Sequence, residues 1–142
     1  MTRTLPGSLS LCLALTQTVT AENWPRFRGE NGTGISDQKG LPVTWSDGNY
    51  AWNIDLPGMG HSAPIIWDDD LFITTAEPRG LTRYILCLNP ADGKEKWRGT
   101  IPMSDSHKHN KSSWASSTPV TDGKLLYVAF ADVEDYVVNA YD

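Results

Sequence analysis

The 142-residue sequence predicts an all-β protein, namely a β-propeller built of four-stranded antiparallel blades. Short apolar runs bounded by Gly, Pro, Asn and Asp dominate, and no segment keeps the i, i+3, i+4, i+7 spacing of an amphipathic helix. A strand–turn–strand pattern also occurs twice: Pro64 and Phe72 in the first copy match Pro119 and Tyr127, each 55 positions later. Four-stranded units that repeat along a chain are typical of propeller blades.

Composition excludes several classes of protein. The chain has 12 Lys and Arg against 17 Asp and Glu, a net charge of −5, so it lacks the clustered basic surface that nucleic-acid binding requires. Hydrophobic residues make up 39% and charged residues 20%, which is typical neither of a membrane-spanning nor of a disordered chain. The expected partners are therefore a protein or a small molecule.

Residues 1–21 are predicted to be a secretory signal peptide. Arg3 supplies the positive start, an apolar run covers residues 9–15, and small residues at 19–21 form a cleavage site. The apolar run is shorter than the ~20 residues that a membrane span needs. An amphipathic helix is the alternative, disfavoured by alternating apolar positions, and a lipid anchor at Cys12 is disfavoured because Leu11 precedes it. We therefore expect an exported protein, periplasmic or extracellular.

The mature chain divides into four parts in order. Residues 22–60 are a lead segment that ends in a blade-closing strand at 52–57, and residues 61–102 are the first complete blade. Residues 103–116 are an inserted inter-blade loop, because Pro119 follows Pro102 by 17 positions whereas Pro64 follows Pro57 by 7. Residues 117–142 are a partial second blade. A plain antiparallel sandwich is the alternative to the blade interpretation.

A turn motif follows the third strand of the first blade. The segment 87–97 resembles the tryptophan-docking motif of quinoprotein-type propellers, A-x-D-x-x-T-G-K-x-x-W. Asn and Asp side chains can bond turn backbone, glycine supplies a positive φ, and the indole can lie across a small residue of an adjacent blade. The motif positions, all structural, are Cys87, Asn89, Asp92, Gly93, Lys94 and Trp97.

The opening of the mature chain extends this resemblance. Residues 24–29, the spaced glycines that follow, and the stretches 60–64 and 114–119 are similar to exported bacterial proteins described as PQQ-binding-like (pyrroloquinoline quinone) β-propeller repeat proteins. The resemblance covers residues 22–142. It implies a propeller of seven or eight blades, of which about two are present here, and a non-catalytic platform for protein interaction or ligand binding that needs no cofactor in this fragment.

Two other kinds of protein have the fold that this resemblance implies, and each suggests another function. One is a PQQ- and Ca²⁺-dependent alcohol or sugar dehydrogenase, whose family pattern requires adjacent cysteines, Glu and Asn calcium ligands and an Asp base. Once the signal peptide is removed, Cys87 is the single cysteine, and its apolar neighbours indicate a small buried side chain. The other is an outer-membrane protein assembly factor of the BamB-like kind, which would need a lipid anchor. Whether the protein is an enzyme stays open, with a non-catalytic role favoured.

A few residues are candidates for chemistry outside the motif. His61 and Trp114 precede the first strands of the two units, where propeller loops reach the central channel, and are candidates for ligand or cofactor binding. His107 and His109 would point to the same side of an extended segment, with Asp105 nearby, which is a possible metal site. Without a third ligand at defined spacing, a solvated polar loop is the favoured interpretation, and no catalytic residue is assigned.

The chain is also short for the predicted fold. A closed propeller needs at least four blades of ~40 residues. We therefore expect a fragment cut inside a repeat, whose partners include the remaining blades of its own full-length chain. Because an isolated repeat cannot bury its apolar faces, the fragment alone is expected to be poorly soluble or disordered.

Overall fold

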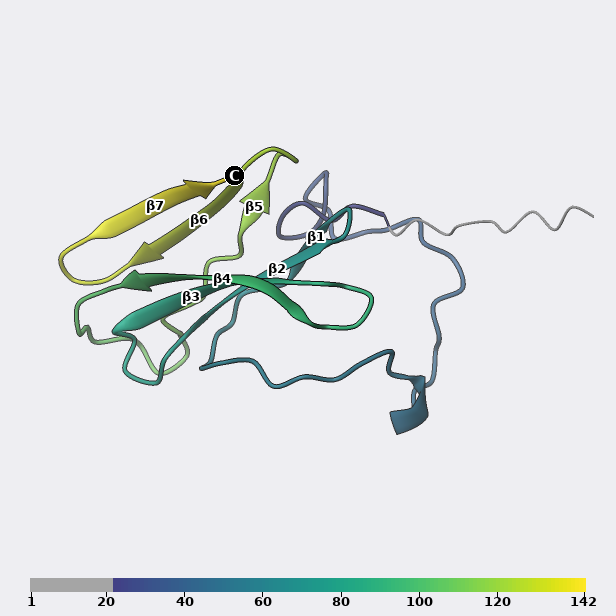
Figure 1. Cartoon of the computed structure of the whole chain (residues 1–142), viewed down its shortest axis with the longest axis horizontal. Helices are drawn as coiled ribbons and strands as arrows, with labels where there is room; N and C mark the ends of the chain where they lie inside the picture. Colours follow the sequence, from purple (N-terminus) through teal and green to yellow (C-terminus); the bar gives the residue numbers. More distant parts are fainter. Residues whose placement is uncertain (1–21) are drawn as a thin grey trace, which may run out of the picture.

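The computed structural model describes residues 22–142, so the predicted signal peptide lies outside the described residues. The all-β prediction is confirmed: the described part forms two antiparallel sheets and one short 3₁₀ turn, η1 (Asp47–Asn49) (Figure 1). A closed ring of blades remains a prediction. What the structure establishes is a pair of sheets with a long lead segment beside them.

The first sheet is a four-stranded meander that lies within residues 61–102. Its strands follow one another in space in chain order, and each neighbouring pair is antiparallel. The short apolar runs and the polar turns between them explain this arrangement, because each strand ends where turn-forming residues begin. The strands are β1 (Ile65–Trp67), β2 (Asp70–Ala76), β3 (Thr82–Leu88) and β4 (Glu95–Pro102).

The second sheet is a three-stranded meander made of β5 (Val120–Thr121), β6 (Leu126–Ala131) and β7 (Tyr136–Tyr141). Its strands pair with one another in the same register as the strands of the first sheet, at the positions that match in the sequence repeat. The equivalent pairs are Ile65–Phe72 with Val120–Tyr127 and Phe72–Cys87 with Tyr127–Ala140. The same side chains of the two meanders therefore point in the same direction relative to their sheets.

The core lies between the two sheets. Because side chains alternate along a strand, β2 and β3 direct one set toward the second sheet, and β6 directs its own set back. This contact buries side chains from both sides: Phe72, Ile85 and Cys87 from the first sheet, and Leu126, Val128 and Phe130 from the second. The outward face of the second sheet carries apolar side chains as well, and Tyr136 and Val138 there are 74% and 62% exposed. Both sheets are thus apolar on two faces.

No strand is assigned at 52–57, so the blade-closing strand there stays a prediction. In residues 22–60 the backbone forms two isolated bridges with the first sheet, Trp24 with Ile66 and Met59 with Ala76, and the Pro25 carbonyl accepts a hydrogen bond from Thr121 of β5. A strand requires a neighbour that takes up its backbone groups over several residues, and residues 52–57 have no such neighbour in the described part of the chain. They are held by Trp52 and by Pro57, whose carbonyl accepts a hydrogen bond from Thr75.

Tryptophans anchor the irregular segments and turns by packing against glycines. In each of four places an indole lies so close to a glycine that a Cβ there would fall within 3 Å of the ring. Three of the contacts join distant segments that carry no strand pairing to one another, and the fourth closes a local turn, so each anchors a loop without a ladder of backbone bonds. The pairs are Trp24 with Gly29, Trp52 with Gly93, Trp67 with Gly123, and Trp114 with Gly80.

Candidate functional site

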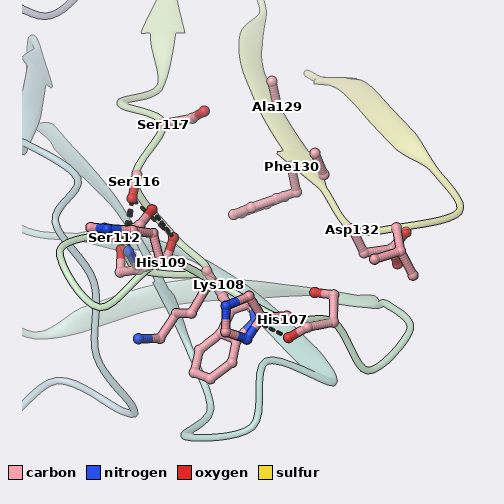
Figure 2. Close-up of a pocket in the computed structure, with 14 residues that line it drawn as sticks. His107, Lys108, His109, Ser112, Ser116, Ser117, Ala129, Phe130 and Asp132 are labelled. Carbon is pink, nitrogen blue, oxygen red and sulfur yellow. Dashed lines mark hydrogen bonds between the residues drawn. The ribbon is translucent and has the colours of Figure 1, made fainter.

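A groove of about 400 Å³ lies between the inserted loop and the second sheet (Figure 2). The loop contributes residues from 106 to 117, and the end of β6 with the turn after it contributes residues 129–133. Residues 103–116 carry no strand. Three of the predicted candidates line this groove, namely His107, His109 and Trp114.

Trp114 anchors the loop to the first sheet. Its ring lies against Gly80, in the turn between β2 and β3, and its Nε1 donates a hydrogen bond of 3.4 Å to the Ser106 carbonyl. The Lys108 ammonium lies over the same ring, 4.8 Å from the centroid, which is a cation–π contact. The indole therefore shapes the groove and places Lys108.

The two histidines share the groove but do not form a metal centre with Asp105. His109 Nδ1 accepts a hydrogen bond of 3.1 Å from the Lys111 backbone, which leaves Nε2 for other partners. Asp105 is drawn away into an ion pair with Arg79, with 2.9 Å between Oδ2 and Nη2. Within residues 22–142 no group of three or more His, Cys, Asp or Glu side chains could hold a metal ion.

His61 lies where the inserted loop meets the start of β1 rather than in the groove lining. Its backbone N–H donates to the Ala115 carbonyl and to the Ser113 hydroxyl, at 3.0 and 3.1 Å. The Ser113 and Ser116 hydroxyls lie 3.0 Å apart, and Ser116 donates to the Ser113 carbonyl. These hydroxyls are consequently used to fix the loop. The His61 side chain itself is exposed.

Asp132, which sequence reasoning missed, fixes the far wall of the groove. Its Oδ1 accepts hydrogen bonds from the backbone N–H groups of Glu134 and Asp135, and its Oδ2 accepts one of 2.6 Å from Ser104. These backbone bonds, with a smaller contribution from the Arg83 charge, lower the pKa of Asp132 below its usual range. The side chain thus joins the inserted loop to the turn between β6 and β7.

We expect Asp132→Asn to lower the melting temperature at pH 7, because an amide has one acceptor oxygen and must give up either the turn or Ser104. A lowered folded-state pKa means that the carboxylate stabilises the fold above its ordinary pKa of about 4 and ceases to do so as it is protonated. The difference from the wild type should therefore shrink as the pH falls below about 4. Thermal unfolding followed by circular dichroism from pH 7 to pH 2 measures this.

The matched control is Asp135→Asn, which removes a carboxylate from the same turn while its backbone N–H can still donate to Asp132. That variant should unfold like the wild type at pH 7. Equal losses in the two variants would mean that only the overall charge of the turn matters.

The docking-motif residues form a tight turn between β3 and β4. Asn89 Oδ1 accepts from the Ala91 backbone and Asp92 Oδ1 from the Lys94 backbone, while Gly93 has a φ of 71°. The Trp52 indole lies on Gly93 and donates to the Pro90 carbonyl at 2.8 Å. The role of the turn is structural, because its polar side chains are used within the turn itself.

Trp97, the last residue of the motif, lies between the two sheets. Its ring stacks on Tyr141 of the second sheet, with 6.1 Å between the centroids, and it also contacts Phe72. The indole was expected to lie across a small residue of an adjacent blade, and its aromatic partner in the second sheet is the tyrosine next to Ala140. Trp97 thus links the edge of one sheet to the last strand of the other.

Cys87 is a buried thiol with no nucleophilic character. It is fully buried between the sheets, and its thiol donates to Asp70 at 3.3 Å. Burial, aided by the neighbouring carboxylate, raises the pKa of Cys87 to about 12. The thiolate, which is the reactive form, is therefore absent at neutral pH.

The described residues do not fit the quinone and calcium of a PQQ-dependent dehydrogenase. Cys87 is the single cysteine in residues 22–142, so adjacent cysteines are not present there. Asp70, the most enclosed of the three consecutive acids at 68–70, is already paired with Lys96 at 2.7 Å. Calcium sites in proteins use six to eight oxygen ligands, and no acidic cluster in this part of the chain supplies them.

In residues 22–142 no helix has the length and hydrophobicity needed to cross a membrane. Comparisons of the chain with protein-family models, with curated proteins and with solved structures find no match in any of the three.

Proposed function

We propose that this chain belongs to an exported, non-catalytic β-propeller of the PQQ-binding-like repeat kind, which serves as a ligand-binding platform. The equivalent register of the two sheets is the observation that carries the proposal. Residues 55 positions apart occupy the same place in two stacked meanders, which is how successive blades are related. The signal-peptide pattern at residues 1–21 supports export.

The proposal of a non-catalytic role rests on the state of the reactive side chains, which are buried or already hydrogen-bonded. The thiol of Cys87 is buried and protonated, and the groove hydroxyls of Ser113 and Ser116 bond each other. Nucleophilic catalysis needs a hydroxyl or thiol within hydrogen-bond reach of an oriented base, and the groove holds no such pair. A platform needs only a fixed surface, which Trp114 and Asp132 provide by tying the inserted loop to both sheets.

The test is an assay of the purified protein with PQQ and Ca²⁺. Absorbance of bound quinone and dye-linked oxidation of alcohols and sugars should both stay at the level of a blank without protein. Turnover would overturn the platform in favour of a quinoprotein dehydrogenase. Co-purification with outer-membrane assembly proteins from envelope extracts would favour the assembly-factor role instead.

A further inference from the structure

The groove beside the inserted loop carries one ammonium, that of Lys108, and one carboxylate, that of Asp132. Lys108 takes part in none of the four ion pairs among residues 22–142, so its ammonium has no carboxylate partner in that part of the chain. It lies in the groove with His107 and His109.

The acidic groups around the groove are already engaged. Asp132 is the one acid in the lining, and its two oxygens accept three backbone hydrogen bonds. Asp105, on the same loop, pairs with Arg79, and Glu134, after β6, accepts the Ser104 hydroxyl. These carboxylates thus have hydrogen-bond or ion-pair partners other than Lys108, so the Lys108 ammonium can pair with a ligand that brings a negative charge.

The groove also has an apolar wall. Phe130 and the alanines at 129 and 131 line it from β6, and Trp114 lines it from the loop. Its volume of about 400 Å³ lies within the range of small-molecule sites, and the polar side chains of the loop face this apolar wall. An apolar wall beside an unpaired cation favours a ligand that has both an apolar body and a negative charge.

We propose that this groove binds a small organic carboxylate, whose charge is received by Lys108 with the help of His107 and His109. The apolar body of the ligand lies against Trp114 and the alanines at 129 and 131 of β6. The inference deepens the platform function and rests on it, because it names the class of ligand that the platform takes. A charged hydrogen bond in a partly desolvated groove is the stronger kind, so Lys108 contributes the larger share of the affinity.

The probe is benzoate, followed by the ¹H–¹⁵N signal of the Trp114 indole, which is assigned by its loss in Trp114→Phe. Benzoate should shift this signal saturably, with a dissociation constant of about 1 mM for so small a ligand. Benzyl alcohol has the same ring without the charge, and it should leave the signal in place. Inorganic phosphate, a charge without the ring, should bind at least about tenfold more weakly than benzoate.

Two lysine variants separate a specific contact from general charge. Lys108→Met should weaken benzoate binding about tenfold, whereas Lys108→Arg should keep most of it. Lys111→Met removes the same charge from the same loop outside the groove lining, and it should leave the affinity within about twofold. Because unchanged spectra elsewhere show that each variant is folded, loss of binding in Lys108→Met reports on the groove.

Several results would overturn the inference. No shift with benzoate up to about 50 mM would show that the groove does not take carboxylates, since this is far above the expected constant. Equal binding of benzyl alcohol would indicate an apolar site, equal binding of phosphate an adventitious ion only, and equal loss in Lys111→Met a diffuse charge effect. Turnover with PQQ, measured separately, would overturn the platform function while leaving a benzoate site in place.

Discussion

Replacement of Gly93 by alanine is expected to lower the free energy of unfolding by about 3 kcal/mol, which is a large effect for one methyl group. Gly93 has a φ of 71°, a conformation that costs a residue with a Cβ about 1–2 kcal/mol. The added Cβ would also lie 2.7 Å from Cε3 of Trp52. The indole cannot withdraw freely, because it would lose its hydrogen bond to the Pro90 carbonyl.

Gly40→Ala is the matched control for this prediction. Gly40 has a φ of 76°, but its Cβ would meet nothing within 4 Å, so the variant carries strain without a clash. It should cost at most about 1–2 kcal/mol. Urea unfolding followed by circular dichroism measures both variants, and equal losses would show that the contact with Trp52 adds nothing.

A double-mutant cycle separates the clash from the strain more directly. Trp52→Ala removes the ring that the new methyl group would strike, so Gly93→Ala should cost less in that background than in the wild type. Since the two residues touch, the coupling energy should be about 1–2 kcal/mol. Strict additivity of the two losses would contradict the proposed contact.

The turn between β3 and β4 illustrates what can be predicted from sequence. Asn89, Asp92 and Gly93 act on backbone groups within a few positions of themselves, so residue type and order are sufficient to indicate the turn. The two sheets follow for the same reason, because apolar runs and turn residues alternate along the chain. The contacts of the tryptophans are different. Trp52 and Gly93 are 41 positions apart, and no local pattern indicates that they meet.

The strand predicted at 52–57 shows a second limit. Its resemblance to residues 97–102 is real in sequence, yet Trp97 lies in β4 because β3 is beside it, and Trp52 has no strand beside it in the described residues. Strand formation is a property of a pair of segments. A repeat found in sequence therefore predicts side-chain roles more safely than it predicts backbone pairing.

The candidate site was predictable only in part. The inserted loop and its two histidines could be found from spacing, because the insertion is visible in the sequence itself. Asp132 could not, since it reaches Ser104 across 28 positions, and the diversion of Asp105 to Arg79 depends equally on the fold. The aspartates at 132 and 135 are typical of an Asx turn, so the sequence predicts the turn itself. It does not predict the contact between this turn and the inserted loop.

Arg83→Met is expected to stabilise the protein by about 2 kcal/mol, opposite in sign to most core substitutions. Arg83 lies on β3 and is 0% exposed, and its Nε and Nη1 have no hydrogen-bond partner among the described residues. Its one side-chain hydrogen bond among the described residues, from Nη2 to the Ala131 carbonyl, is 3.5 Å long. Burial lowers the pKa of Arg83, and the charges of Asp132 and Glu77 offset this effect only in part.

Methionine fills nearly the same space without polar atoms that need partners, and exchanging buried ionic groups for apolar ones of similar size often stabilises a protein. Arg98→Met on β4 is the control: Arg98 is partly exposed and paired with Glu95, so its loss should change stability by at most about 0.5 kcal/mol. Chemical unfolding of both variants decides the matter. A loss of stability in Arg83→Met would mean that the buried guanidinium has partners on which the contact between the sheets depends. A gain in stability would show that the buried charge of Arg83 destabilises the fold.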